Sequence, residues 1–157
     1  MRWVELDLIK TFTAEEYASG LESWAWLGLE GKTPMCSSLF GDVFFLADDG
    51  VWWLDTITGE LTHEWGSVDE VEAALNSEEG QDKYLLAGLA LAVAESGLVP
   101  AENQIYDFSH PPVLGGELEV ANIDVASMDM SLNMLGQIHD QVRGLPPGTE
   151  ISGIEFG

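Results

Sequence analysis

The stretch from Phe40 to Trp65 constrains the fold of this chain more than any other. It divides into three short apolar runs, which are Asp42–Leu46, Val51–Asp55 and Glu60–Trp65. Asp48-Asp49-Gly50 separates the first two runs, and Ile57-Thr58-Gly59 separates the last two. Aromatic and β-branched residues suit a pleated sheet, and Asp-Gly between two such runs is a strong hairpin signal. We therefore predict a three-stranded antiparallel meander over about residues 40–65.

The aromatic pairs of this meander raise a question about its two faces. Successive residues of a strand point to opposite faces, so Trp52 and Trp53 cannot share one core, and neither can Phe44 and Phe45. Either helices cover both faces of the sheet, or one aromatic row is exposed and binds a partner. The residues alone leave both alternatives open.

Four helices are predicted around the meander. Capping boxes at Thr13–Glu16 and Ser67–Glu70 begin helices over about residues 13–27 and 68–75. Apolar spacing predicts two more over about residues 82–96 and 129–143, and the former is apolar enough to be central and buried. Residues 32–39 are expected to form a connector.

Further strands are predicted after the third helix. Imperfect strand patterns occur near residues 105–125, with a change of phase near Asn122 that indicates a bulge, and again near residues 150–156. Strands and helices are segregated along the chain more than they alternate, which favours an α+β fold. A length of 157 residues is most simply one domain, spanning residues 1–157.

The charge of the chain restricts its partners. Five basic residues stand against 28 acidic ones, which gives a formal net charge of −23. So few scattered cations form no phosphate-binding patch, so direct binding of nucleic acid is disfavoured. The acidic surface is explained either by solubility or a saline environment, or by a basic partner that is attracted electrostatically.

Cysteine content and hydropathy indicate a cytoplasmic protein. The single cysteine, Cys36, excludes an internal disulfide and suits a reducing compartment. The N-terminal run contains two acidic residues and does not resemble a signal peptide. The longest apolar run, Leu85–Val93, is far shorter than the roughly 20 residues that a membrane helix needs. We expect a soluble protein without membrane contact.

No motif in the sequence points to catalysis. His63, His110 and His139 lie on different predicted elements and at no metal-ligand spacing. Gly115-Gly116 has no phosphate-loop context, and Asp48-Asp49-Gly50 lacks the further ligands of a calcium loop. We therefore expect no enzyme and assign no catalytic, cofactor-binding or metal-binding residues.

The surface of the meander and of the helix after it is the remaining candidate site. Acidic residues cluster there, and one explanation is a solvated face with acids at hairpin tips and helix starts. The other is a partner-binding surface with a tryptophan anchor, because tryptophan is enriched at interface hot spots and charges around it set the association rate. Its candidate residues are Asp48, Asp49, Trp52, Trp53, Glu60, Glu64, Asp69 and Glu72.

Four segments in order carry a resemblance to a known family. They are LESWAWLGLEG (Leu21–Gly31), FGDVFFLADDGVWWLDTITG (Phe40–Gly59), LGGELEVANID (Leu114–Asp124) and LGQIHDQVRGLPPGTEI (Leu135–Ile151). Together they resemble the C-terminal domain of bacterial type VI secretion immunity proteins, the class that protects cells from DNase effectors. The resemblance implies a cytoplasmic protein that binds a toxin and blocks it, and it implies neither catalytic residues nor an oligomeric state.

The charge is compatible with this resemblance. Nucleases that grip phosphate backbones tend to be basic, and an acidic protein can occupy such a surface by presenting carboxylates in place of phosphates. Two other functions stay open on the sequence. One is an acidic regulatory or scaffold module with another basic cytoplasmic partner, and the other is a small hydrolase built on the carboxylates.

Overall fold

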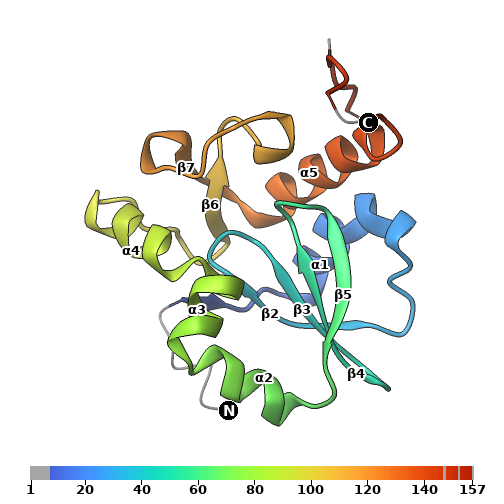
Figure 1. The fold of residues 1–157 in the computed structure, drawn as a ribbon, viewed down its shortest axis with the longest axis vertical. Coiled ribbons are helices and arrows are strands. Elements are labelled where there is room, and N and C mark those ends of the chain that lie inside the picture. Colours follow the sequence, from blue (N-terminus) through green and yellow to red (C-terminus); the bar gives the residue numbers. More distant parts are fainter. Residues whose placement is uncertain (1–7, 147, 152, 157) are drawn as a thin grey trace.

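The structure, a computed structural model, describes residues 8–146, 148–151 and 153–156. Its fold is α+β: a five-stranded antiparallel sheet in the order β1-β2-β3-β4-β5 packs with helices, and β6 and β7 form a second, two-stranded sheet (Figure 1). The strands are β1 (Ile9–Lys10), β2 (Thr33–Ser38), β3 (Val43–Ala47), β4 (Gly50–Asp55), β5 (Glu60–Trp65), β6 (Gln104–Phe108) and β7 (Ile123–Ser127). The helices are α1 (Ala14–Leu21), α2 (Val68–Leu75), α3 (Glu78–Leu85), α4 (Ala87–Glu95) and α5 (Met128–Val142), with short 3₁₀ helices η2 (Glu22–Leu27), η3 (Pro112–Leu114) and η4 (Val120–Asn122).

The predicted meander is confirmed as β3, β4 and β5. Asp48 and Asp49 form the turn between Ala47 and Gly50, which pair directly. Gly50 has a φ of +129°, and a Cβ added there would overlap the carbonyl oxygen of Trp65. Glycine is required at this position because β5 approaches the hairpin so closely.

The connector predicted for residues 32–39 is wrong, because it contains β2, which pairs with β3 and with β1. Pro34 and the polar Ser37 and Ser38 obscure the strand pattern in the sequence. Pro34 is tolerated because the register shifts between Pro34 and Cys36, and proline is accepted at such irregularities. Cys36 is buried, and burial raises the pKa of its thiol to about 12.

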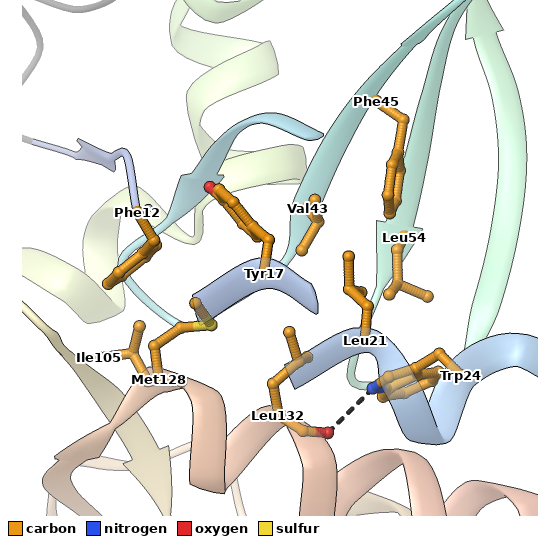
Figure 2. Close-up of a cluster of buried hydrophobic side chains, with 10 residues drawn as sticks. All are labelled: Phe12, Tyr17, Leu21, Trp24, Val43, Phe45, Leu54, Ile105, Met128 and Leu132. Carbon is orange, nitrogen blue, oxygen red and sulfur yellow. Dashed lines mark hydrogen bonds between the residues drawn. The ribbon is translucent and has the colours of Figure 1, made fainter. Parts of the chain in front are cut away.

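Helices cover both faces of the sheet, so the alternative of a fully exposed aromatic row is wrong. On one face, Val43, Phe45 and Leu54 pack against α1, η2 and α5 (Figure 2). There the indole Nε1 of Trp24 donates a hydrogen bond to the carbonyl oxygen of Leu132, at 2.9 Å. On the other face, the cluster joins the sheet to α2 and α3, and its buried residues are Cys36, Phe44, Val51, Val71, Leu75 and Leu85.

The first two helices begin as predicted. Thr13 caps α1 with a complete capping box, in which Glu16 N donates to Thr13 Oγ1 at 3.1 Å and Thr13 N donates to Glu16 Oε1 at 3.0 Å. The α-helix ends at Leu21, and the rest of the predicted span is the 3₁₀ helix η2. Ser67 caps α2, but Glu70 accepts a hydrogen bond from Gly66 N, one residue before the cap.

The single buried helix predicted for residues 82–96 is wrong. Leu86 adopts a left-handed conformation, with φ and ψ of 49°, and divides the segment into α3 and α4. Ser77 caps α3 through Gly80 N at 3.0 Å, so this helix begins earlier than expected. Ala90 and Val93 are the buried residues of α4, whereas Leu91 is 61% exposed. The break separates the mostly polar α3 from the apolar α4, each with one buried side, and raises the number of α-helices in the described residues to five.

The later strands are confirmed in part. β6 and β7 pair within residues 104–127, and the expected bulge near Asn122 is the 3₁₀ helix η4. A third buried cluster packs this small sheet and Phe40 against α4. The strand predicted near residues 150–156 is wrong, since the described residues of that segment form no strand. Glu155 N instead donates to Gln141 Oε1 at 3.0 Å, so the segment bonds to a side chain of α5 rather than to a sheet.

Candidate partner-binding surface

The sheet separates the eight predicted surface residues. Asp48 and Asp49 are exposed at the β3–β4 turn. Trp52 packs against the cluster on the α1 and α5 face, and Trp53 packs against the cluster on the α2 and α3 face. Glu60 pairs with Asp55 at the other end of β4, roughly 17 Å from the turn along the strand. The structure therefore does not bring Glu60 together with the turn.

One cluster forms around the half-buried ring of Trp52. Its Nε1 donates to Asp49 Oδ1 at 2.8 Å, and the ring of His63 stacks on it with a centroid distance of 5.0 Å. Lys32 Nζ lies 4.3 Å from the centroid of the Trp52 ring. We call Asp48, Asp49, Trp52, His63 and Lys32 the hairpin-tip surface.

Electrostatics within the hairpin-tip surface keep Asp49 ionised. The hydrogen bond from Trp52, followed by the attraction of His63, holds the pKa of the Asp49 carboxyl below its usual range. His63 Nδ1 lies 4.0 Å from Asp49 Oδ2. The indole is therefore held in place by a charged side chain, while part of its ring stays accessible.

The opposite face places Trp53 in a more enclosed setting. Its ring meets Tyr84 edge-on at 4.8 Å, and Tyr84 also contacts Trp65 at 4.8 Å. Tyr84 donates its hydroxyl to Glu64 Oε1 at 2.7 Å, and burial together with this carboxylate raises the pKa of Tyr84 to about 12. Trp53 Nε1 is buried without a hydrogen-bond partner in the described residues. Glu64 thus serves as an acceptor for Tyr84, and Lys83 Nζ lies 4.0 Å from it.

The start of α2 lies at the same end of the sheet as the hairpin tip. A Cβ on Gly50 would lie 3.0 Å from Gly66 Cα, directly before the helix. Asp69 is exposed in the first turn of α2, and Glu72 is half-buried one turn later. The exposed acids Glu78, Glu79 and Asp82 of α3 continue this acidic side, along which Lys83 is the basic residue. The sequence showed that acidic residues cluster in this part of the chain, but only the fold places α2 beside the hairpin tip.

A buried acid escaped the sequence analysis. Asp42 is 2% exposed and accepts hydrogen bonds from Ser38 Oγ at 2.8 Å, Thr56 N at 2.8 Å and Thr56 Oγ1 at 2.7 Å. Burial, reinforced by the charge of Asp55, raises the pKa of Asp42 to about 6. His139 is also buried, and its Nε2 lies 2.8 Å from the carbonyl oxygen of Thr56. No sequence pattern marks Asp42, because its partners come from other segments of the chain.

Asp42 and His139 make hydrogen bonds that join β2, the β4–β5 turn and α5. No set of three or more His, Cys, Asp or Glu side chains within the described residues is placed to hold a metal ion. A partly open pocket between Phe40, Asp107 and Ser131 has a volume of about 30 Å³, whereas a larger, more open one lined by Thr11, Phe12 and Glu16 has a volume of about 590 Å³. None of the helices in the described part of the chain has the length and apolar character that a bilayer span needs.

Comparison with known families confirms the resemblance over part of the chain. Residues 66–139 match the model of the family described as T6SS immunity protein Tdi1, C-terminal. The match begins just before α2 and ends within α5, so it contains Leu114–Asp124 and the start of Leu135–Ile151, and leaves the meander outside. No curated protein matches the chain.

Comparison with solved structures supports the fold. The crystal structure of Atu4351 from Agrobacterium tumefaciens is similar, with a TM-score of 0.56 and 17% sequence identity. The alignment covers 83% of this chain and 66% of that chain, so the present chain spans less than two thirds of the length of that protein.

Proposed function

We propose, on the premise that residues 66–139 match a family of type VI secretion immunity proteins, that this chain binds and neutralises a cognate secreted antibacterial effector. The family match is the observation that carries the proposal. Binding alone performs this function, and it needs no catalytic group. The complex would form in the cytoplasm, where an effector that cleaves DNA finds its substrate.

The charge supports a basic nuclease as the effector. With 28 acidic and five basic residues, the chain generates a negative field that attracts a cationic partner and speeds its association. A nuclease surface that neutralises phosphates accepts carboxylates in the same places. The exposed acids at the hairpin tip and on α2 and α3 are the groups that would substitute for phosphates.

The hairpin-tip surface suits the role of an anchor. Trp52 is half-buried, and its indole is already held by Asp49. A side chain that is ordered before binding loses little conformational freedom when a partner covers it. Asp48 and Asp49 would then govern the association rate, whereas Trp52 would govern dissociation.

Affinity capture from a lysate of the source organism, washed at low and then at high salt, tests the class of partner. We expect a basic nuclease at stoichiometric yield, whose toxicity in a host cell is suppressed when this chain is co-expressed. A basic partner without toxicity would support a regulatory or scaffold module instead. Failure to protect cells from every captured nuclease would overturn the proposal.

Charge reversal at the hairpin tip tests the surface. Asp48→Lys combined with Asp49→Lys is expected to slow association with the captured effector and to weaken its salt dependence. Glu117→Lys combined with Glu119→Lys is the matched control, because these exposed acids lie on the segment between η3 and η4 and undergo the same change of charge. Equal association rates for the two variants would exclude the tip from the interface.

A further inference from the structure

The five-stranded sheet has two edges that differ in length. β1 has two residues, whereas β5 has six and pairs with β4 on one side only. In the described part of the chain no strand pairs with the outer side of β5. Proteins protect long edges with charged side chains, above all lysine, with proline, with bulges or with a covering element, because an open edge presents unpaired N–H and C=O groups. The sequence of β5, ELTHEW, contains neither lysine nor proline, and its charged residues Glu60 and Glu64 are acidic, so they repel an acidic strand and attract a basic one.

The register identifies the residues whose backbone groups face outward. Ala47 and Gly50 close the β3–β4 turn, so their N–H and C=O groups point toward each other. Alternation along β4 then directs the groups of Trp53 toward β5, where Thr62 lies opposite. The flanking residues of β5, Leu61 and His63, therefore direct their N–H and C=O groups away from β4.

A bulge sets the limit of this open edge. Val51 pairs with Trp65 while Trp52 pairs with His63, so Glu64 is the extra residue on β5. Bulges twist a strand and end regular pairing. The regular edge available to another strand therefore runs from Glu60 to His63.

Charge decides which strand fits. A second copy of the chain would bring two molecules of −23 together and would pair a strand carrying Glu60 and Glu64 with its own duplicate. Like charges on paired strands are destabilising, whereas opposite charges on them are stabilising. The edge is also continuous with the hairpin-tip surface, because His63 of β5 stacks on Trp52.

We propose that a short, extended and basic segment of the effector pairs with the outer edge of β5 and adds a strand to the sheet. This inference rests on the proposed immunity function. Backbone hydrogen bonds would hold the segment, and its basic side chains would face Glu60 and the acids at the hairpin tip. The aromatic and acidic groups beside the strand would then select among extended segments.

Amide hydrogen exchange with the captured effector tests the edge directly. We expect exchange at Leu61 and His63 to slow at least about tenfold in the complex, because a new strand would shield outward-facing amides that β4 does not bind. Thr62 is the internal control, since its amide already faces β4 in the free protein. Unchanged exchange at Leu61 and His63 in a stable complex would overturn the edge inference and leave the immunity function standing.

A proline substitution provides the second readout. Leu61→Pro removes an outward N–H, which edge strands tolerate, and Leu61→Ala is the control for the loss of the side chain. We expect Leu61→Pro to bind the effector about tenfold more weakly than Leu61→Ala. Equal affinities of the two folded variants would contradict the edge inference. If the proline variant does not fold, hydrogen exchange at Leu61 and His63 of the unmodified chain tests the inference instead. If the unmodified chain captures no nuclease, both the proposed immunity function and the edge inference are wrong.

Discussion

Asp42 shows how a single residue ties three segments of this chain together. It receives hydrogen bonds from Ser38 at the end of β2 and from Thr56 in the β4–β5 turn. The carbonyl oxygen of the same Thr56 lies 2.8 Å from His139 Nε2 of α5. Three donors favour the carboxylate form of Asp42, but complete burial opposes it more strongly, so its pKa is raised to about 6.

Asp42 should make stability depend on pH. Because its folded pKa lies above the unfolded value near 3.8, the folded state holds a proton that the unfolded state has released between these pH values. This contribution is present below about pH 4 and is lost as the pH rises through about 6, by about 3 kcal/mol. Asp42→Asn should remove it, which urea unfolding at pH 4, 5, 6 and 7 would measure.

The pH profile of the parent protein would contradict this expectation if it ran parallel to that of Asp42→Asn. His139 acts in the opposite direction, since burial lowers its pKa and the stability of its neutral form is lost as the pH falls below about 6.5. His139 is present in both proteins, so the difference between the two profiles contains the contribution of Asp42 and its coupling to His139 through the shared Thr56.

The two adjacent tryptophans should respond differently to truncation. Trp52→Ala is expected to speed dissociation of the effector at least about tenfold while the fold survives, because Trp52 lies on the hairpin-tip surface. Trp53→Ala should mainly lower the free energy of unfolding, by about 2 kcal/mol, because the half-buried Trp53 packs against Tyr84 and the cluster on the α2 and α3 face. Surface plasmon resonance and urea unfolding separate these effects. Unfolding of both variants would show that both indoles belong to the core and would remove the anchor.

At the scale of elements, the approach of α5 to η2 is set by a missing side chain. A Cβ on Gly136 would overlap Ser23 Oγ and lie 2.8 Å from the ring of Trp24. Ser23 Oγ donates to the carbonyl oxygen of Asn133 at 2.6 Å, and Trp24 is held by its own bond to Leu132. The contact is therefore fixed by two hydrogen bonds to carbonyl oxygens of α5 that lie about one turn before the glycine.

Gly136→Ala should destabilise the protein, although alanine is the better helix former. We expect the free energy of unfolding to fall by about 1–3 kcal/mol, because the added methyl group must displace Ser23 or Trp24. Gly88→Ala in α4 is the matched control, since its Cβ would meet nothing within 4 Å, and it should raise stability by up to about 1 kcal/mol. The same sign of change in both variants, measured by thermal unfolding, would show that helix propensity outweighs the α5–η2 contact.

Elements were predictable where one local signal specified them. The Thr13–Glu16 capping box, the Asp48-Asp49-Gly50 turn and the apolar spacing of α5 each act within a few residues. β2 was missed because Pro34 and Ser37 break its pattern, and pairing with β3 overrides that local preference. The break at Leu86 was missed because a leucine in the left-handed region has no sequence signature, and the packing on both sides holds it there.

At the scale of the whole molecule, the charge of −23 should oppose compaction. Salt screens repulsion between exposed charges that lie more than about 8 Å apart at physiological ionic strength. We therefore expect the midpoint of thermal unfolding to rise between low and high sodium chloride concentrations, by roughly 3 °C for each kcal/mol of repulsion relieved.

The Glu117→Lys and Glu119→Lys variant supplies the control for the salt experiment. Its net charge is −19, because each replacement adds two positive units to −23. The rise in its unfolding midpoint with salt should be smaller than that of the parent protein. A midpoint that is independent of salt in both proteins would show that the acidic residues are spaced widely enough to avoid mutual repulsion.

The candidate site was predictable in its residue types but only partly in its arrangement. The abundance of acids follows from composition, whereas the alternation of strand residues left open whether an aromatic row is exposed. Tertiary packing decided that Glu60 lies apart from the hairpin tip, that Trp52 bonds to Asp49, and that Glu64 accepts from Tyr84 of a distant helix. These contacts depend on strand register and helix packing. Patterns along the sequence do not report either of them.

The amino-acid order alone specified the meander, the first helix and the acidic character of this protein, because turn chemistry, capping and charge are local properties. Only the folded structure decided that helices cover both faces of the sheet and that the outer edge of β5 stays open in the described residues. Which faces of the sheet are covered and which of its edges are unpaired depend on where segments distant in the sequence pack. That placement is set by the burial of apolar area summed over the whole molecule rather than by any one segment.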